Sequence, residues 1–431
     1  MKYDVIILGA GLAGITIANK LQSIGMTVLV LEKGDKLEYT SSDPSTDKLA
    51  SVSTYAFGQG GTTNLWHSGL IYPRIDDIKN KELQSKYHEL KEFIPEALNI
   101  LGGYYNPFEL KRGKSQLTFE TNDIFYPDTH KPLVINDGVD AFYGIKVEKI
   151  SPNDKEISFI DENKSLKVFG YNKLVLCCGG LNTPRVLKEL FDINFTGFND
   201  HPMGFVGKVK VKKEYIPEFC NIQSRKVKGG HVKTALLIKD KDMTSCFYLR
   251  PAASLTMNDK ISKYKSLLGA STGLSLIKNM FDIRIFHPDI ISEIIFKIFG
   301  RVLSKRHYSV LFIGEQFDNE SALTTNYAEL KISKDHIAKY REHICEFFKQ
   351  ISIYCESVSY NKEVSRSELW SAAHYSSSAS LGLVVDSNYQ LQNYKDVYVC
   401  DTSIIPDHGY YNTGLFITTI CLQFCEQLRD S

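Results

Sequence analysis

The first 32 residues show two hydrophobic patterns in succession. Residues 5–8 form a continuous apolar run, which is typical of a strand buried on both faces of a parallel sheet. A glycine turn follows, and apolar residues then recur at helical spacing up to Ile24. A second apolar run, residues 27–31, leads directly to Glu32. The pattern predicts a strand, a helix that begins at the glycine turn, and a second strand that ends at an acidic residue.

The rest of the chain separates into two regions near residue 200. Before it, apolar runs predict strands at 133–135, 145–150 and 173–178, and a helix at 185–191 with Asn182 or Thr183 as its cap. After it, short apolar runs between polar turns predict an antiparallel sheet from residues 206–211, 232–238, 246–249 and 308–313. Helical periodicity marks residues 76–101, 335–357 and 414–428, and residues 397–400 read as one more strand.

Composition narrows the class of protein. The 431 residues are 43% hydrophobic and 23% charged, which is typical of a globular chain, and the length favours two domains. A formal charge of +1 argues against a nucleic-acid partner. Nine cysteines without a C-x-x-C pair predict reduced thiols and no metal site, and no signal peptide or membrane-spanning run is apparent. We therefore expect a cytoplasmic protein. The apolar and basic segment 285–306 is either a helical lid or a site of peripheral membrane contact.

The glycine turn has the spacing of a dinucleotide-binding site. Gly9, Gly11 and Gly14 fit G-x-G-x-x-G: the first permits a tight turn, the second lets the backbone approach a pyrophosphate, and the third lets helix and strand pack closely. The helix N-terminus favours the phosphates, and Glu32 is placed to bind ribose hydroxyls. The motif alone does not separate FAD from NAD. A second glycine-rich loop at 58–66 is predicted to approach the same ligand.

The C-terminal third completes a set of motifs that resembles the glucose/methanol/choline (GMC) oxidoreductases. The matching blocks, in chain order, are the glycine turn with Glu32, the loop Gly60-Gly61-Thr62-Thr63-Asn64, the turn 178–184, the segment 199–202, the segment His374 to Gly382, and Asp401 to Pro406 followed by Asn412. Glu315-Gln316 with Asn319 is similar to a strand of the family's substrate domain. Ser377-Ser378 stands where Gly-Thr is usual in the family, and Tyr375 replaces a proline.

The resemblance implies an α/β fold, with a Rossmann-type FAD-binding domain and a discontinuous second domain built on an antiparallel sheet with helices. We expect the FAD-binding domain at 1–203 and 371–431, with a covering segment at about 40–130, and the substrate-binding domain at 204–370. The implied FAD contacts, besides the glycine turn and Glu32, are Gly60, Gly61, Thr62, Asn64, Val147 beside the adenine, Asp401 near the ribityl or phosphate groups, and Thr413 at the start of the last helix.

Alcohol oxidation needs a base for the hydroxyl proton and a hydrogen-bond donor to the same oxygen. A neutral histidine suits the first role, since its pKa lies near 6.5 and such a base contributes about 10² to 10⁴ in rate. His374 and Asn412 are the implied pair; a turn-capping histidine and a helix-capping asparagine are the alternative interpretations. His67 is a candidate for a covalent flavin link, His408 and Tyr411 for lining the pocket, and His201 for a structural role.

These residues together predict FAD-dependent oxidation of the CH–OH group of a sugar, polyol or cyclitol-like substrate. A single dinucleotide fingerprint leaves no second site for a nicotinamide, so the expected electron acceptor is oxygen, a quinone or a carrier protein. Two alternatives remain open: a flavoenzyme of other chemistry, such as desaturation or amine oxidation, and a non-catalytic protein with an FAD-binding fold.

Overall fold

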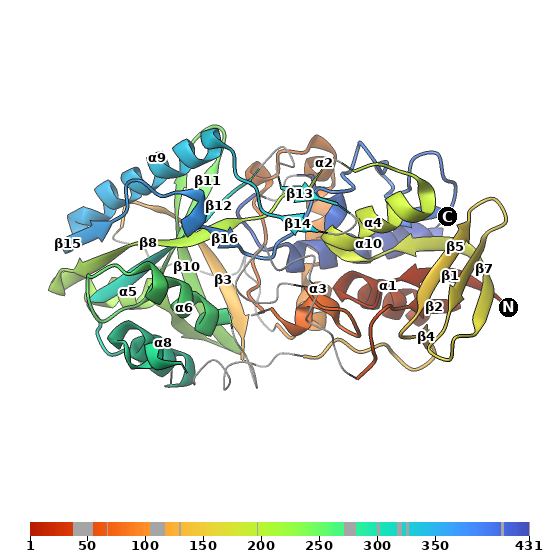
Figure 1. Ribbon diagram of the computed structural model, residues 1–431, viewed down its shortest axis with the longest axis horizontal. Coiled ribbons are helices and arrows are strands. Elements are labelled where there is room, and N and C mark those ends of the chain that lie inside the picture. Colours follow the sequence, from red (N-terminus) through yellow and green to blue (C-terminus); the bar gives the residue numbers. More distant parts are fainter. Residues whose placement is uncertain are drawn as a thin grey trace.

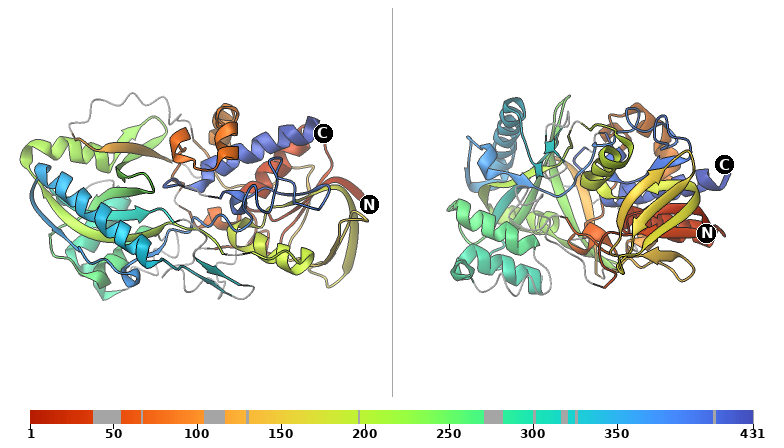
Figure 2. Two further views of the ribbon diagram at one scale, coloured as in Figure 1. Left: turned by 90° about the horizontal axis from the view of Figure 1, so that it is seen from above. Right: turned by 45° about the vertical axis from the view of Figure 1, so that its right-hand side comes forward.

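The computed structural model describes residues 1–37, 55–66, 68–103, 117–128, 131–195, 197–270, 282–299, 302–316, 321–324, 327–406 and 409–430. These residues form two lobes, each built on its own sheet, and both chain termini lie at the outer end of one lobe (Figure 1). Figure 2 shows the two lobes from two further directions.

The lobe that holds the termini is built on a seven-stranded sheet. β1 (Lys2–Leu8) lies at its centre, parallel to β2 (Val28–Leu31) and β7 (Leu166–Leu176). The strand order is β4-β2-β1-β7-β6-β5, with β17 (Val397–Val399) also paired to β7; the remaining members are β4 (Asp140–Phe142), β5 (Lys146–Ser151) and β6 (Glu156–Ile160). The predicted strand–helix–strand unit is confirmed, because α1 (Leu12–Ser23) connects β1 to β2.

Long-range packing closes this lobe. The last helix, α10 (Thr413–Asp430), packs against α1, so the two ends of the chain share one core. α4 (Gly179–Phe191) follows β7, and α2 (Lys81–Glu92) and α3 (Ile94–Ile100) pack against α10. The C-terminal segment therefore returns to the glycine-turn lobe after the second lobe has been built.

The second lobe is an eight-stranded antiparallel sheet in the order β15-β8-β12-β11-β10-β3, with β16 paired to β8 and β9 to β10. Its strands are β3 (Glu120–Pro127), β8 (Pro202–Val211), β9 (Arg225–Val227), β10 (Gly230–Lys239), β11 (Thr244–Pro251), β12 (His307–Gly314), β15 (Cys355–Tyr360) and β16 (Trp370–Ser371). α9 (Lys334–Ile351) packs on one face, where the rings of Phe247 and Phe347 stack with centroids 4.0 Å apart. The α/β fold with a second, antiparallel lobe is confirmed; the residue boundaries of the domains stay a prediction.

Smaller elements complete the second lobe. The helices are α5 (Ile216–Gln223), α6 (Asp259–Ala270) and α8 (Pro288–Phe299), and a two-stranded ribbon pairs β13 (Ala322–Leu323) with β14 (Ala328–Glu329). None of the helices that the structure describes is both long and apolar enough to cross a bilayer.

Three local predictions were wrong. Residues 133–135 form no strand: the carbonyl of Val134 instead accepts from the Asn19 amide on α1, and β4 takes the sheet edge. The helix expected to run to residue 357 ends at Ile351, because residues 355–360 add β15 to the sheet. α4 begins at Gly179 rather than near residue 183, since the Thr183 hydroxyl bonds the buried Asp401 carboxylate instead of capping the helix.

Candidate active site

The three glycines of the first turn are in different environments. Gly9 has φ +102°, and a Cβ there would lie 2.4 Å from the Cys177 carbonyl oxygen. A Cβ on Gly14 would lie 1.9 Å from the Gly9 carbonyl oxygen. Gly11 differs, because a Cβ there meets no atom within 4 Å. Packing within the chain thus explains two of the glycines, while space beside Gly11 is left open.

The open space adjoins the N-terminus of α1. Gly11 is the N-cap residue, no side chain caps the helix, and its first turn has no acidic residue. Free backbone N–H groups and the positive end of the helix dipole favour an anion there. The turn therefore fits the pyrophosphate of a dinucleotide, with Gly11 giving the backbone room to approach it.

Glu32 holds the loops around this turn together. Its buried carboxylate accepts from the backbone nitrogens of Ala10 (2.7 Å), Gly34 (2.7 Å) and Gly58 (3.0 Å). A carboxylate offers about four acceptor positions, so one is left for a ribose hydroxyl. Glu32 connects the glycine turn to the second glycine-rich loop, and its contact with ribose stays a prediction.

The second loop lies directly against the first. Gly60 donates its N–H to the Ala10 carbonyl at 2.8 Å, and a Cβ on Gly61 would lie 3.1 Å from the Gly11 Cα. Asn64 shapes the loop by donating to the carbonyls of Gln59 and Gly61, and Thr62 lies between them in the same short 3₁₀ turn. The structure thus brings together the two loops that the sequence assigned to one ligand.

Two other predicted cofactor contacts have structural partners of their own. The buried Asp401 carboxylate accepts from the backbone N–H groups of Gly179 and Ser403, each at 2.8 Å, and from the Thr183 hydroxyl. Val147 lies half-buried on β5, paired with Phe159. Their roles at the cofactor stay predictions, and for Asp401 the backbone is the group left to make a contact.

The predicted base His374 lies where distant segments meet. The buried carboxylate of Asp200 accepts from the backbone nitrogens of His201 (2.7 Å) and His374 (2.9 Å), and from the Ser371 hydroxyl. Asn199 and Ser376 exchange two backbone hydrogen bonds of 3.0 Å. Residues 199–201 and 371–376 therefore form one hydrogen-bonded unit. The sequence placed Asp200 in a matching block but predicted none of its contacts, and it missed Ser371, because neither spacing nor periodicity relates positions so far apart.

The two histidine side chains of this unit are in contact. The Nδ1 atoms of His201 and His374 lie 2.8 Å apart, with the rings nearly perpendicular, and Nε2 of His201 contacts the carbonyl oxygen of Gly409. Burial, and secondly the neighbouring His201 ring, lower the pKa of His374 to about 3. Burial lowers the pKa of His201 to about 4. Both rings are therefore neutral near pH 7, which is the state a general base requires.

Asn412, the predicted partner, lies three residues beyond Gly409 and directly before α10. Its Nδ2 donates to the Gly69 carbonyl at 2.7 Å, which fixes the amide and leaves its second N–H for another acceptor. A Cβ on Gly69 would lie 3.1 Å from both Asn412 Nδ2 and Tyr126 Cε1, and Tyr126 belongs to β3 of the antiparallel sheet. Asn412 thus lies at the junction of the lobes, with the buried Thr413 opening α10 behind it.

Several sequence candidates are not placed. His67, His408 and Asn319 lie outside the described residues. Tyr411 is fully buried against Phe416, which is a core position rather than a pocket wall.

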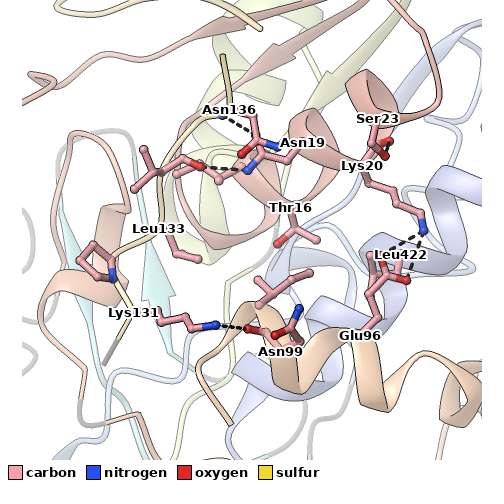
Figure 3. Close-up of a pocket in the computed structure, with 14 residues that line it drawn as sticks. Thr16, Asn19, Lys20, Ser23, Glu96, Asn99, Lys131, Leu133, Asn136 and Leu422 are labelled. Carbon is pink, nitrogen blue, oxygen red and sulfur yellow. Dashed lines mark hydrogen bonds and ion pairs between the residues drawn. The ribbon is translucent and has the colours of Figure 1, made fainter. Parts of the chain in front are cut away.

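A cavity of about 360 Å³ opens elsewhere, between α1, α3 and residues 131–136 (Figure 3). Asn19, Lys20 and Thr16 of α1 face it, and Lys20 pairs with Glu96 across it at 3.0 Å. His374, Asn412 and the glycine turn do not line it. The cavity is therefore separate from the chemistry predicted for the chain.

Comparisons with known proteins agree with this geometry. Residues 336–421 match a family model described as GMC oxidoreductase, and residues 7–57 match one described as NAD(P)-binding Rossmann-like domain. Among solved structures, pyridoxine 4-oxidase from Mesorbium loti is similar with a TM-score of 0.60 and 12% identity, over 100% of this chain and 99% of that one. Curated protein sequences give no match. The chain is thus similar to the GMC oxidoreductases in its glycine turn, in its two-lobed fold and over residues 336–421.

Proposed function

We propose that the protein is an FAD-dependent oxidoreductase that oxidises the CH–OH group of a small alcohol. The observation that supports this most strongly is the His374 side chain, which is neutral, partly accessible and hydrogen-bonded to His201 through one ring nitrogen. His201 in turn contacts the carbonyl oxygen of Gly409, three residues before Asn412. A glycine turn with open space beside Gly11 supplies a second, independent site in the same chain.

The glycine turn and Glu32 bind the cofactor in this proposal, and His374 and Asn412 act on the substrate. Gly11 and the N-terminus of α1 hold the pyrophosphate, and Glu32 binds ribose with its remaining acceptor position. FAD, when bound, supplies the acceptor for the hydride that leaves the carbinol carbon. His374 takes the hydroxyl proton on a ring nitrogen, and the free N–H of the Asn412 amide donates to the substrate oxygen and holds it in line. The product is the corresponding aldehyde or ketone.

The substrate class is proposed as a sugar, polyol or cyclitol-like alcohol, with oxygen, a quinone or a carrier protein as electron acceptor. Pyridoxine, after which the structurally similar oxidase is named, adds an aromatic primary alcohol to the set worth testing. A cytoplasmic location belongs to the same proposal. An alkene or imine product would favour desaturation or amine oxidation instead.

Anaerobic reduction of the bound flavin tests the proposal. The purified holoprotein is mixed with a panel of sugars, polyols, cyclitols and pyridoxine, and loss of the flavin absorbance is followed. We expect at least one alcohol to bleach the flavin, and His374→Ala to slow bleaching at least about a hundredfold while retaining the cofactor. The matched control is His88→Ala, since His88 is exposed on α2. Equal rates in both variants would remove His374 from the mechanism.

Peripheral contact with a membrane is a second proposal, specific to segment 285–306 and its neighbours. Ile283, Phe286 and Phe299 are 85%, 77% and 66% exposed, while Ile290, between them in the chain, is buried against α6. Large apolar side chains exposed along one segment favour an apolar partner. Co-sedimentation with anionic liposomes should be weakened by Phe286→Ser together with Phe299→Ser. If the wild-type protein remains in the supernatant, the membrane proposal is wrong and the helical lid is the interpretation that remains.

A further inference from the structure

We propose that His201 is a positioning residue that fixes which ring nitrogen of His374 bears the proton, and so leaves Nε2 of His374 as the basic atom. The inference rests on the proposed function for its use, but its chemical content concerns this chain alone. It gives a role in the site to a histidine that the sequence assigned to a structural turn.

The Gly409 carbonyl determines the first proton position. Its oxygen can only accept a hydrogen bond, so the Nε2 atom of His201 that contacts it must bear a proton. A neutral imidazole has one N–H, and therefore Nδ1 of His201 is a lone-pair acceptor. That atom lies 2.8 Å from Nδ1 of His374. Hence Nδ1 of His374 must be the donor.

This proton position determines the state of Nε2, the other nitrogen of the His374 ring. With its single proton on Nδ1, neutral His374 has a lone pair on Nε2, and no described residue hydrogen-bonds to that atom. The reverse arrangement would place the His201 Nε2 lone pair against the Gly409 carbonyl oxygen, which is repulsive. The chain of contacts from Gly409 through His201 to His374 therefore allows one arrangement of protons.

The same contact suits the protonated state of the base. When His374 accepts a substrate proton at Nε2, its Nδ1–H continues to donate to His201 and becomes a stronger, charge-assisted donor. The ionisable group that faces both histidine backbones is Asp200, whose carboxylate accepts from their two N–H groups. Its negative charge, when present, also favours the imidazolium. The proton gained at Nε2 is the one lost by the alcohol oxygen, so the step balances.

A structural role for His201 is the competing explanation, since the side chain is fully buried and could serve only to fill its site. Two substitutions separate the two explanations. In His201→Asn, the amide oxygen takes the position of Nδ1 and can still accept from His374, while the contact with Gly409 is lost. In His201→Gln, the amide nitrogen takes the position of Nε2 and can still donate to Gly409, while the acceptor for His374 is lost.

Rates of flavin reduction in the holoprotein give the first measurement. If His201 orients the His374 proton, His201→Asn stays within about fivefold of wild type and His201→Gln falls by about tenfold or more, in kcat rather than KM. If His201 only fills space, the two variants lose activity equally, or the shorter Asn loses more because it leaves the larger cavity. Either of those results overturns the proposal.

Nitrogen NMR of the wild-type holoprotein gives a second measurement, which needs no substrate and uses a variant only to assign the signals. The protein is labelled with ¹⁵N-histidine, and the His374 signals among the 11 histidines are identified by their loss in His374→Ala. We expect Nδ1 of His374 to be protonated and Nε2 to be unprotonated at pH 7.5. The opposite tautomer overturns the inference even in an active alcohol oxidoreductase. The expected tautomer in a protein that no alcohol reduces would sustain the inference and count against the proposed function.

Discussion

The glycine turn and the histidine cluster both contain backbone with positive φ angles, but they place it on different residue types. The histidine cluster comprises residues 199–201, 371–376 and 409. In the turn and its partner loop, the positive φ angles fall on glycines: Gly9, Gly58, Gly60 and Gly61. In and beside the cluster one falls on Gly409, but two fall on Ala373 (φ +64°) and Ser377 (φ +71°), which have side chains. Left-handed backbone costs a non-glycine residue about 1–2 kcal/mol. The glycine turn is therefore built without strain, and the histidine cluster holds strain next to His374, the proposed base.

The two regions also differ in how they are held. The turn is local, since Glu32 lies 22 residues from the Ala10 N–H it accepts from. In the cluster, the hydrogen-bonded histidines are 173 positions apart and His201 contacts a carbonyl 208 positions away. Ser377, which stands where the related family has glycine, is kept in place by a hydrogen bond from its hydroxyl to the Pro406 carbonyl. Long-range polar contacts thus hold the backbone conformation of the cluster, whereas glycine residues and close packing hold that of the turn.

The largest expected effect comes from placing a methyl group in the turn. Gly14→Ala puts a Cβ 1.9 Å from the Gly9 carbonyl oxygen, which is backbone and cannot move aside. We expect a loss of about 3 kcal/mol in the free energy of unfolding, at the upper end of overpacking effects. Gly11→Ala is the matched control, because no atom lies within 4 Å of its new Cβ.

The Gly11 variant separates stability from cofactor binding. Gly11→Ala should unfold within about 1 kcal/mol of wild type when the cofactor is absent, because only the N-cap residue changes. It should nevertheless bind FAD at least about tenfold more weakly, as the methyl group occupies the space left for the pyrophosphate. Urea unfolding and flavin content measure the two quantities. Normal flavin binding in Gly11→Ala would show that the open space has another purpose.

The same contrast explains what the sequence could reveal. The fold class, both sheets and the glycine turn were predictable, because hydrophobic periodicity and glycine spacing act over a few residues. The resemblance to the GMC oxidoreductases pointed to His374 and Asn412, whose roles stay predictions. The contacts among Asp200, His201 and His374 were not predictable, since only the completed fold brings them together. The failed strand at 133–135 has the same origin: its apolar residues pack beside α1 instead of joining a sheet.

The next effect concerns Asp200 as the acceptor that joins two segments. Asp200→Ala leaves the backbone N–H groups of His201 and His374 and the Ser371 hydroxyl without their acceptor in a buried site. Each unsatisfied group costs about 1–3 kcal/mol, so we expect a loss of about 3 kcal/mol after partial relaxation. Asp200→Asn keeps an acceptor oxygen and should lose about half as much or less. Urea unfolding of both holoproteins measures this, and equal stabilities would mean that the carboxylate does not hold the segments.

The charge of Asp200 makes the cluster sensitive to pH. Burial raises the pKa of Asp200 to about 6, from an ordinary value of 3.8. Between these values the folded state retains a proton that the unfolded state has lost, so stability falls as pH rises. Relative to Asp200→Asn, the wild-type protein should lose up to about 3 kcal/mol from pH 4 to pH 7, at about 1.4 kcal/mol for each pKa unit. The pKa values of His201 and His374, about 4 and about 3, leave both rings neutral over most of this range, so Asp200 dominates the difference. A difference that stays constant with pH would contradict the assignment.

The smallest effect tests the strain itself. Ala373→Gly relieves the cost of a left-handed alanine, about 1–2 kcal/mol, and adds about 0.5–1 kcal/mol of backbone entropy to the unfolded chain. We expect a net gain of up to about 1 kcal/mol in the free energy of unfolding. The neighbouring Ala372, whose φ is not positive, is the matched control: Ala372→Gly has no strain to relieve and should lose about 0.5–1 kcal/mol. If the two variants lose stability equally, the left-handed turn before His374 stores no strain, and the two regions differ only in the reach of their contacts.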